Sequence, residues 1–292
     1  MKILLLGANG QLGYELRGAL SCFAEVSACS RAEADLADEA STRDLIARLH
    51  PAVIVNASAY TDVDGAEREP KVAHHINGHM VGVLGEEAVR RGAGLVHFST
   101  DFVFDGEKGT PYVETDTPHP LGEYARSKLA GEKMLAETDA PAIVFRTAWV
   151  YSLRRKSFVT TMLRLAREKE TLGVVTDQVG SPTFCRDLAE AVAMILYRMG
   201  GAAPHAIAAA RGIYHLAGAG SVSRFEWTRA ILELDPKKSE HRTKTLSPIR
   251  SADFPLPARR PLATPLDCTK ARDQWGIALP DWRDALARAL SS

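Results

Sequence analysis

The chain begins with the stretch Lys2-Ile3-Leu4-Leu5-Leu6-Gly7-Ala8-Asn9-Gly10-Gln11-Leu12-Gly13, and a helix-like pattern follows it. The run at 2–6 is apolar and has the length expected of a buried parallel strand. Glycines allow a tight turn and a close approach to a pyrophosphate, and the first amides of the next helix favour an anion. Strand, glycine turn and helix together predict a dinucleotide site. Because the spacing is Gly-x-x-Gly-x-x-Gly and not the commoner Gly-x-Gly-x-x-Gly, a turn without a ligand remains an alternative.

Apolar runs alternate with helix-like segments through the first half of the chain. The expected strands are 2–6, 24–29, 52–55, 94–99 and 142–146, and the expected helices lie near 11–21, 40–49, 70–91 and 122–138. This alternation predicts an α/β fold, a Rossmann-like doubly wound parallel sheet. Beyond residue 150 the pattern weakens: 158–168 and 186–199 are typical of helices, 200–210 predicts a loop, and the proline-rich stretch 247–265 predicts an extended, irregular segment.

This pattern divides the chain into two parts. We expect a dinucleotide-binding Rossmann domain at 1–150. Residues 151–292 are expected to form a smaller C-terminal lobe that mainly binds substrate, with some segments returning to the Rossmann domain. In doubly wound sheets, ligands bind beyond the carboxyl ends of the strands. The segments in that position are 7–13, Ser30-Arg31, 56–61, Thr100-Asp101 and 149–151, so we expect them to form one site.

Tyr124 and Lys128 are four residues apart in a segment with a helical pattern. That spacing places a phenol and an ammonium on one face of a helix. The cation can lower the pKa of a tyrosine that ordinarily titrates near about 10, so that the phenol exchanges a proton with a carbonyl or alcohol oxygen near neutral pH. The hydroxyl of Thr100 could fix that oxygen in place. Such pairs also occur by chance on surface helices, so the spacing alone leaves both interpretations open.

Composition excludes several classes of function. The 292 residues are 46% hydrophobic and 25% charged, with a formal net charge of zero. We therefore expect an ordinary globular protein with no nucleic-acid partner. No apolar stretch reaches the length of a membrane span. The four cysteines form no metal-type cluster and a chain of this size needs no disulfides, so we expect a cytoplasmic protein with reduced thiols and no bound metal.

Several motifs resemble those of the extended short-chain dehydrogenase/reductases, and within them the dTDP-4-dehydrorhamnose reductases. The resemblance runs nearly from end to end. Its motifs are Gly-Ala-Asn-Gly-Gln-Leu-Gly at 7–13, Val-Asn-Ala-Ser-Ala-Tyr-Thr at 55–61, Ser-Thr-Asp-Phe-Val-Phe-Asp-Gly at 99–106, the Tyr124 segment at 124–132, Arg-Thr-Ala-Trp-Val-Tyr at 146–151 and Pro-Ala-Arg-Arg-Pro at 257–261. The runs at 99–106, 146–151 and 257–261 point to the reductase branch.

The resemblance implies reduction of the C4 ketone of dTDP-4-dehydro-L-rhamnose by hydride from NADPH or NADH. It also implies that Tyr124 donates a proton to the new alkoxide, and that Lys128 lowers the pKa of Tyr124 and binds the nicotinamide ribose. The hydroxyl of Thr100 is expected to bond the sugar oxygen. Charge grows on that oxygen in the transition state, so donors preset around it would lower the barrier selectively.

The same resemblance implies two sets of binding residues. Those expected at the cofactor are Gly7, Asn9, Gly10, Gln11, Leu12, Arg31, Asp35, Leu36, Ala57, Ala59, Tyr60, Thr61, Ser99, Tyr124 and Lys128. Those expected at the sugar nucleotide are Thr61, Thr100, Asp101, Trp149 and Arg259. Structural roles remain alternatives for some of them: Trp149 in the core, Asp35 as a loop or cap residue, and Thr61 as a helix N-cap.

The residue after the second strand bears on the choice of cofactor. A basic residue there accommodates the 2′-phosphate of NADP, and an acidic one binds the ribose hydroxyl of NAD. Arg31 favours NADPH, while Glu33 and Asp35 shortly after it leave NADH open. Some members of the family carry Mg²⁺ at a dimer contact that involves a glutamate at the position of Glu15. The sequence by itself does not support a metal, and it leaves a homodimer open.

Two departures from the family pattern affect the expected site. Phe102 stands where the family often has tyrosine, and the run 119–123 before Tyr124 differs from the usual Pro-x-Asn-x-Tyr-Gly pattern. Two other functions remain as alternatives. One is another nucleotide-sugar enzyme, an epimerase or dehydratase, although Phe102 stands where a dehydratase typically carries an acid. The other is an NADP-binding regulatory subunit resembling the β subunit of methionine adenosyltransferase.

Overall fold

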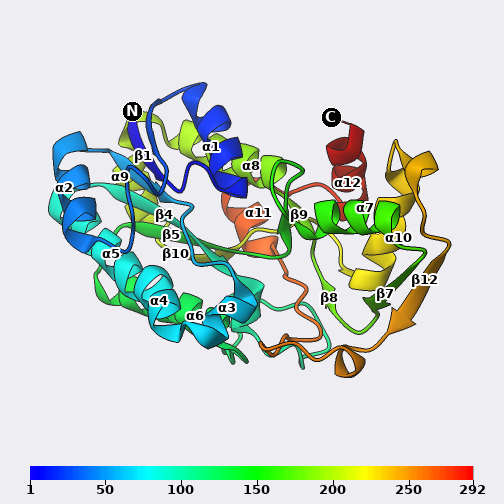
Figure 1. Cartoon of the computed structure of the whole chain (residues 1–292). Coiled ribbons are helices and arrows are strands. Elements are labelled where there is room, and N and C mark those ends of the chain that lie inside the picture. Colours follow the sequence, from blue (N-terminus) through cyan, green and yellow to red (C-terminus); the bar gives the residue numbers. More distant parts are fainter. Residues whose placement is uncertain (292) are drawn as a thin grey trace.

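The computed structural model describes residues 1–291, and a six-stranded parallel sheet lies at its centre (Figure 1). The strand order is β10-β5-β4-β3-β1-β2. The strands are β1 (Lys2–Leu6), β2 (Glu25–Cys29), β3 (Val53–Asn56), β4 (Gly94–Thr100), β5 (Ala142–Thr147) and β10 (Gly212–His215). The predicted α/β class and doubly wound parallel sheet are confirmed. The first five strands lie within a residue of their expected positions.

Helices cover both faces of this sheet. The helices are α1 (Gln11–Ser21), α2 (Glu39–Leu49), α3 (Val63–Arg68), α4 (Pro70–His74), α5 (Met80–Arg91), α6 (Glu123–Glu137), α8 (Cys185–Met199), α9 (Ala203–Ala209) and α11 (Thr269–Trp275). On β1, Ile3 and Leu5 face one way and pack with α1, α8 and α9, whereas Leu4 and Leu6 face the other way and pack with α2 and α5. Since both faces are buried, the strand is apolar at every one of these positions.

Two segments differ from the expected secondary structure. The predicted helix at 70–91 is interrupted by a π-helical turn at His75–His79, between α4 and α5. The predicted loop at 200–210 is wrong, because it contains α9. Its alanines are strong helix formers, Pro204 lies in its first turn, and Ile207 is buried against the sheet beside Gly94. The flanking Gly200 and Gly201 masked this short helix in the sequence.

The rest of the chain forms a second body beside the carboxyl edge of the sheet (Figure 1). Its elements are β6 (Val150–Tyr151), α7 (Phe158–Glu168), β7 (Thr171–Val175), β8 (Val179–Gly180), β9 (Thr183–Phe184), β11 (Val222–Ser223), α10 (Arg224–Leu234), β12 (Thr245–Ile249) and α12 (Trp282–Ser291). Trp227 is fully buried at its centre, with Tyr151 and Leu286 in the same cluster.

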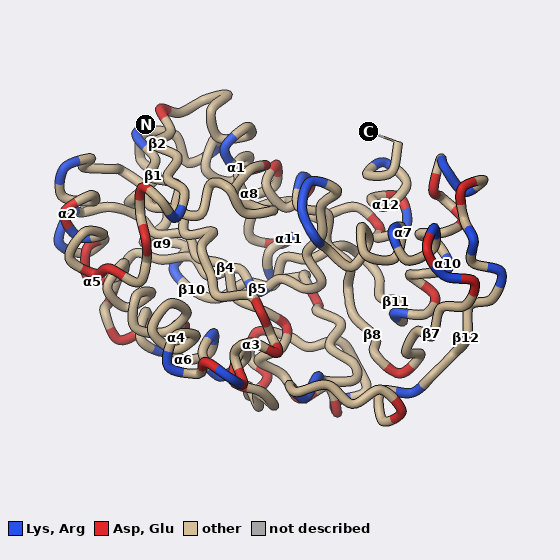
Figure 2. Tube along the Cα trace, in the orientation of Figure 1, with Lys and Arg blue, Asp and Glu red and all other residues tan. Residues whose placement is uncertain are grey.

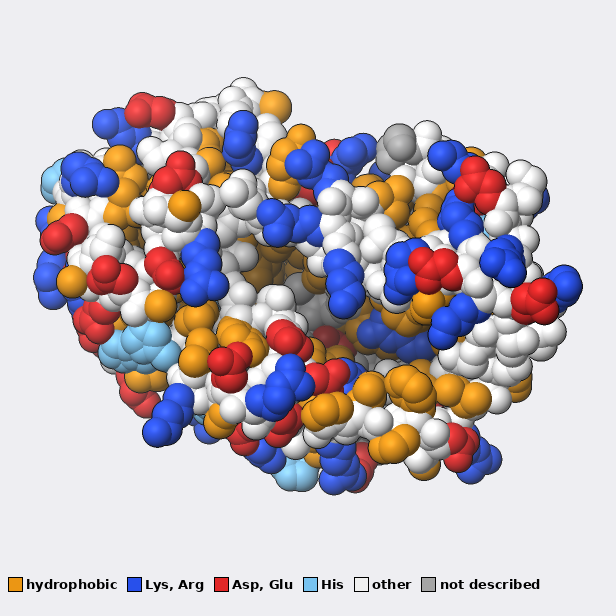
Figure 3. Space-filling view, in the orientation of Figure 1, with side chains coloured by type: hydrophobic (Ala, Val, Ile, Leu, Met, Phe, Trp, Pro, Cys, Tyr) orange, Lys and Arg blue, Asp and Glu red, His pale blue; other side chains and the backbone are white. Residues whose placement is uncertain are grey.

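The second half of the chain also contributes to the first body. Strand β10 pairs with β5, and α8 packs against α1. Figure 3 shows the surface hollowed between the two bodies, beyond the carboxyl ends of the strands. Acidic and basic residues are mixed along both bodies (Figure 2), in keeping with the zero formal charge. No helix within residues 1–291 combines the length and the apolar character needed to cross a membrane.

Candidate functional site

In the glycine turn after β1, the backbone at the start of α1 lies directly against the backbone of Gly7. Gly7 has φ +79°, in the region that favours glycine. A Cβ on Gly13 would lie 2.1 Å from the carbonyl oxygen of Gly7. Gly10 caps α1 without a side-chain hydrogen bond, and the first turn of α1 has no acidic residue. The first amides of α1 therefore keep free N–H groups, and the predicted residues Asn9, Gln11 and Leu12 lie on this turn. This geometry fits a dinucleotide pyrophosphate.

The end of β2 carries a small charged cluster. The Arg31 Nε donates to Asp35 Oδ2 at 3.2 Å, and both side chains are exposed. Asp35 also accepts from the amide of Ala37, and this bond contributes most to lowering the pKa of its carboxyl group. Glu33 accepts from the amide of Ser30 at 2.7 Å. Within residues 1–291 the other two guanidinium nitrogens of Arg31 have no hydrogen-bond partner. Leu36 is buried in the same hydrophobic cluster as Leu4 and Leu6.

A short segment after β3 runs past the glycine turn. Ser58 lies against Gly7, because a Cβ on Gly7 would come within 2.7 Å of its hydroxyl oxygen. The predicted residues Ala57, Ala59 and Tyr60 are half-buried and Thr61 is exposed. Asp62, and not Thr61, is the N-cap of α3. The segment is held by Asn77 of the π-helical turn, which accepts from the amide of Tyr60 and donates to its carbonyl, both at 2.9 Å.

Sequence analysis missed Asn77, which also donates to the hydroxyl of Ser127 at 3.0 Å. It thus joins the segment after β3 to the helix that carries Tyr124. A π-helical turn often marks a functional position. No regular helical pattern reveals such a turn, so periodicity could not have found this residue.

Ser99, Thr100 and Asp101 are buried at the carboxyl end of β4. The hydroxyl of Ser99 donates to Glu132 at 2.5 Å, and Glu132 forms a buried ion pair with Arg146. Asp101 accepts from the hydroxyl of Thr264 at 2.5 Å. Burial raises the pKa of Asp101 to about 6, against the opposing hydrogen bonds from Thr264 and Thr100.

Tyr124 lies in the first turn of α6, beside Thr100. Burial raises the pKa of Tyr124 to about 12, and the hydrogen bond with the Thr100 side chain partly opposes that rise. The ring of Phe102 meets the ring of Tyr124 edge-on, with 6.2 Å between their centroids. The phenol and the threonine hydroxyl therefore lie together as expected, and Phe102 packs against the phenol ring instead of adding a hydroxyl.

Lys128 lies one turn further along α6, and its head group bonds to β4. Its Nζ donates to the carbonyl of Phe98 at 2.7 Å and lies 3.3 Å from Nε2 of His97. Burial lowers the pKa of Lys128 to about 8. The expected lowering of the Tyr124 pKa by Lys128 is not seen in this structure, because the head group of Lys128 bonds to β4.

Trp149 and Arg224 form the opposite wall, on the side of the second body. Trp149 has φ +43°, a strained conformation for a side chain of this size, and packs over Gly180. The Arg224 guanidinium lies 3.5 Å from the Trp149 ring centroid and 4.6 Å from that of Phe158. Within residues 1–291 that guanidinium has no salt bridge or hydrogen-bond partner. Burial lowers the pKa of Arg224 to about 9, and Asp101 opposes the shift.

Sequence analysis did not single out Arg224. It follows Ser223, the N-cap of α10, and nothing in the sequence distinguishes it from an ordinary surface arginine. Of the two adjacent arginines in the proline-rich stretch, Arg259 is exposed, whereas Arg260 forms a salt bridge with Asp64 at 2.8 Å. Asp64 also accepts from the amide of Ala258. The stretch is therefore fastened to α3, at the rim of the site.

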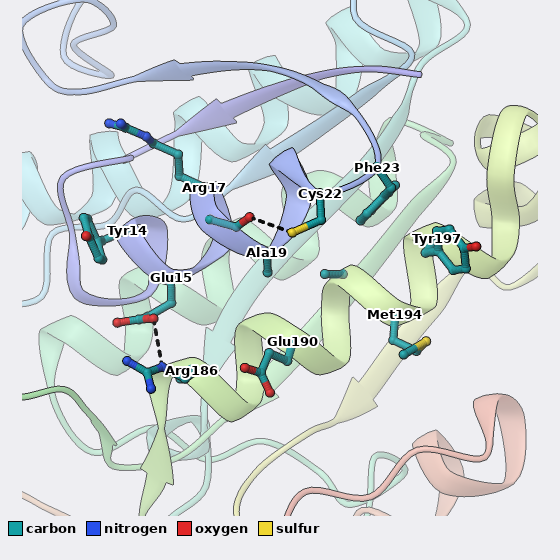
Figure 4. A pocket seen from close by; sticks show the side chains of 12 residues that line it. Tyr14, Glu15, Arg17, Ala19, Cys22, Phe23, Arg186, Glu190, Met194 and Tyr197 are labelled. Atoms are coloured by element: carbon teal, nitrogen blue, oxygen red, sulfur yellow. Dashed lines mark hydrogen bonds and ion pairs between the residues drawn. The ribbon is translucent and has the colours of Figure 1, made fainter. Parts of the chain in front are cut away.

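A separate cavity of about 810 Å³ lies between α1 and α8 (Figure 4). Tyr14, Met194 and Tyr197 are exposed on its lining. Glu15 is paired there with Arg186 at 3.5 Å. Nowhere in 1–291 do three or more acidic, histidine or cysteine side chains gather as metal ligands would. None of the residues that line this cavity is a predicted catalytic, cofactor-binding or substrate-binding residue, and so it does not belong to the candidate site.

Comparison with known proteins agrees with this arrangement. The model of the family described as RmlD substrate binding domain matches residues 1–292. A dTDP-4-dehydrorhamnose reductase from Burkholderia thailandensis is 41% identical, with 98% of this chain and 97% of the relative covered. The one from Escherichia coli is 36% identical, over 100% of this chain and 97% of the relative.

Solved structures give the same result. The crystal structure of a dTDP-4-dehydrorhamnose reductase from Bacillus anthracis in complex with NADP has a TM-score of 0.88 and 30% identity, and covers 99% of this chain and 98% of that one. A UDP-glucose 4-epimerase from Thermus thermophilus in complex with NAD has a TM-score of 0.79 at 19% identity, covers 100% of this chain and 98% of that one, and shares the fold. The predicted resemblance is confirmed, and the chain belongs to the dTDP-4-dehydrorhamnose reductase family.

Proposed function

We propose that this protein reduces the C4 ketone of dTDP-4-dehydro-L-rhamnose to dTDP-L-rhamnose, with NADPH as the hydride donor and Tyr124 as the proton donor. The single observation that carries the proposal is the contact of the Thr100 and Tyr124 side chains at the carboxyl end of β4. It lies at the same sheet edge as the open helix N-terminus of the glycine turn. The identity of the substrate is inferred from the relatives at 36% and 41% identity, both of which are dTDP-4-dehydrorhamnose reductases.

The residues of the site suit each part of this reaction. NADPH, when bound, supplies a hydride to the carbonyl carbon. The hydroxyls of Thr100 and Tyr124 would hold the carbonyl oxygen and stabilise the charge that develops on it. A phenol with a pKa of about 12 is protonated at neutral pH, so Tyr124 begins the reaction as an acid. The charged form of Lys128, which is populated below its pKa of about 8, would then stabilise the tyrosinate electrostatically.

The cofactor would lie across the carboxyl edge of the sheet. Its pyrophosphate would meet Gly10, Gln11 and Leu12 at the start of α1. We assign the 2′-phosphate to Arg31, because within the described residues 1–291 its only hydrogen bond, from Nε to Asp35, leaves the other guanidinium nitrogens as donors. Asp35 and Leu36 follow on the adenine side. Ala57, Ala59, Tyr60 and Thr61 would run along the middle, with Ser99 and Lys128 at the nicotinamide end. NADH remains a weaker donor in this proposal.

The sugar nucleotide would occupy the hollow between the two bodies. Asp101 and Trp149 would contact the sugar, with Thr61 and Arg259 at the rim. We assign the diphosphate to Arg224, because its guanidinium forms no salt bridge within residues 1–291 and lies over the ring of Trp149. Planar guanidinium groups bind phosphate oxygens in pairs, which gives orientation as well as affinity.

These assignments give each part of the chain a function. Residues 1–150 would form the dinucleotide-binding domain, and residues 151–292 would mainly form the substrate-binding lobe. The segments that return to the sheet would be those of α8, α9, β10 and α11. Nucleotide sugars and nicotinamide cofactors meet in the cytoplasm, and we place the reaction there.

We also infer that the face of α1 and α8 joins two copies of the chain. The exposed Tyr14, Met194 and Tyr197 surround the cavity on this face, and such side chains are common at protein contacts. Met194→Glu would place a charge in that contact and should convert a dimer into monomers in light scattering. A wild-type protein that is monomeric at every concentration would contradict this inference.

The experiment that tests the function is NADPH oxidation with dTDP-4-dehydro-L-rhamnose as substrate. Oxidation accompanied by formation of dTDP-L-rhamnose supports the proposal. Binding of NADPH without oxidation would contradict it. A parallel assay with the UDP-linked keto sugar tests the nucleotide base, because only the dTDP substrate is expected to be turned over efficiently.

A further inference from the structure

His97 is a fully buried histidine of β4 that lies between two polar partners. Its Nδ1 is 3.1 Å from the side-chain nitrogen of Asn56, and its Nε2 is 3.3 Å from Nζ of Lys128. Burial lowers the pKa of His97 well below its ordinary value, and Lys128 lowers it further when charged, so the ring is neutral in either case. A neutral imidazole has one donor and one acceptor nitrogen, and the neighbours decide which is which.

The orientation of Asn56 is set by Ser58. The Ser58 amide can only donate, and it donates to the Asn56 side-chain oxygen at 3.1 Å. The NH₂ group of Asn56 therefore faces His97. Since an amide NH₂ is a donor, Nδ1 of His97 must accept, and the proton of the neutral ring is on Nε2. That proton points at Lys128.

The amine of Lys128 is the last member of a hydrogen-bond chain that runs from the Ser58 amide through Asn56 and His97. An ammonium has three donors and no acceptor, whereas a neutral amine has a lone pair that can accept from Nε2 of His97. A charged Lys128 would bring two donors together at that contact. If the ring proton of His97 were on Nδ1 instead, two donors would face each other between Asn56 and His97. If the Asn56 amide were also flipped, two donors would face each other between Asn56 and the Ser58 amide. Each bond in this chain is satisfied only when Lys128 is neutral.

We propose that His97 is a positioning residue of the reductase: it donates its Nε2 proton to the amine of Lys128 and so couples the charge of Lys128 to a hydrogen-bond chain that begins at the Ser58 amide. The coupling concerns the same site as the proposed function and rests on it for its catalytic meaning. Ser58 lies against Gly7 of the glycine turn, so the chain connects the cofactor turn with the proton-transfer residues.

The other titratable and charged groups around Lys128 do not take the place of its hydrogen bond with His97. Glu132, on the same helix, favours the charged form of Lys128, but it is itself bonded to Arg146 of β5. Tyr124 and Asp101 lie on the side of the sugar. His75 belongs to the π-helical turn that packs on α6. Within residues 1–291, His97 is the one side chain that lies within hydrogen-bond distance of Nζ of Lys128.

Two substitutions reverse the hydrogen bond between residue 97 and Lys128, so that Lys128 becomes the donor. His97→Gln keeps a polar group near Nε2, and its amide can turn its oxygen toward Lys128. Asn56→Asp keeps His97 but presents a carboxylate to Nδ1, which moves the ring proton to Nδ1 and leaves Nε2 as an acceptor. Both changes favour the ammonium, so both should raise the pKa of Lys128. His215→Gln is the matched control, because His215 is an equally buried histidine on β10 that bonds to the Tyr112 carbonyl.

The direct measurement is an NMR titration of Lys128 in protein labelled with ¹³C at the lysine ε-carbons, assigned with Lys128→Arg and recorded without substrate. The wild-type amine should titrate near pH 8. His97→Gln and Asn56→Asp should each move this titration upward by about one unit, the size of one exchanged hydrogen bond. His215→Gln should leave it in place. If one of the two variants does not fold, the other still decides.

The pH profile of turnover gives an independent reading. The alkaline limit of kcat should follow the titration of Lys128, moving upward in both variants and not in the control. A wild-type Lys128 that titrates near the ordinary value of about 10.4, or a titration unchanged in both variants, would overturn the proposal. Since the titration needs no substrate, a failure of the proposed function would show separately, as absence of turnover with the expected pKa shifts intact.

Discussion

The guanidinium of Arg224 lies over the indole of Trp149, 3.5 Å from the ring centroid, and forms no salt bridge within residues 1–291. The two residues are 75 positions apart, and the strained backbone of Trp149 is part of what brings them together. This cation is half-buried and stacked over an aromatic ring, so it has lost part of its water without gaining a carboxylate. A diphosphate is the ligand that would complete it.

Arg224→Gln should therefore weaken substrate binding. Loss of a hydrogen-bonded charge costs about 1.5–3 kcal/mol, so KM for the sugar nucleotide should rise roughly tenfold to a hundredfold, with a smaller change in kcat. Arg229→Gln is the matched control on the same helix, because Arg229 is exposed and paired with Glu226. Steady-state kinetics with varied sugar nucleotide measures both. An unchanged KM in Arg224→Gln would remove Arg224 from the diphosphate site.

Arg31→Asp should change the preference between cofactors. The substitution places a carboxylate where the 2′-phosphate of NADPH would meet a guanidinium, next to the existing Asp35. KM for NADPH should rise by about tenfold or more, because a charge-assisted contact becomes a repulsion. KM for NADH is the internal control, since NADH lacks that phosphate. A parallel rise for both cofactors would mean that Arg31 does not reach the 2′-phosphate.

Gly13→Ala should disrupt the cofactor turn, because its Cβ would overlap the carbonyl oxygen of Gly7 at 2.1 Å. Overpacking of this kind costs about 1–3 kcal/mol, and the displaced turn should also lose affinity for NADPH. Gly18→Ala is the matched control on the same helix. A Cβ there has no atom within 4 Å, and alanine is the better helix former. Calorimetry with and without NADPH separates the effects, and equal behaviour of the two variants would contradict the account.

Asp101→Asn should change how stability depends on pH. The pKa of Asp101 is raised to about 6, above its ordinary value of 3.8, so the folded protein holds this proton more tightly than the unfolded chain. The contribution of Asp101 to stability is full below the unfolded pKa and is lost as pH rises through the folded one. That loss is roughly 3 kcal/mol for a shift of about two units.

The asparagine variant should lack this decline between about pH 4 and pH 6, which urea unfolding at a series of pH values would measure. Asp105→Asn serves for comparison, because hydrogen bonds lower the pKa of Asp105 and its contribution runs in the opposite direction. Identical pH profiles for the wild type and Asp101→Asn would show that Asp101 keeps its charge in the folded protein.

Much of this site could be predicted because the relevant signals are local. The apolar run at 2–6, the three glycines after it and the spacing of Tyr124 and Lys128 are each contained in a short stretch of sequence. The sheet then brings such stretches together, since all its strands are parallel and end at one edge.

What the sequence could not reveal depends on contacts between distant residues. Arg224 becomes distinctive only when Trp149 lies beneath it, and Asn77 only when the π-helical turn aims it at Tyr60 and Ser127. The direction of the Lys128 head group depends on His97 of β4, which no spacing within α6 could indicate. Helix α9 was missed because its helix-forming alanines are preceded by glycines and its stability comes from burying Ile207.

The account depends most on Tyr124 as the proton donor in the reduction of a keto sugar. Its most direct test compares wild-type protein with Tyr124→Phe in single-turnover oxidation of NADPH by dTDP-4-dehydro-L-rhamnose, with dTDP-L-rhamnose quantified as product. The account predicts product equal to the NADPH oxidised by the wild type. For the variant it predicts a rate lower by a factor of about 10² or more with NADPH binding retained, because only the proton donor is removed. A variant that forms dTDP-L-rhamnose at nearly the wild-type rate would contradict it.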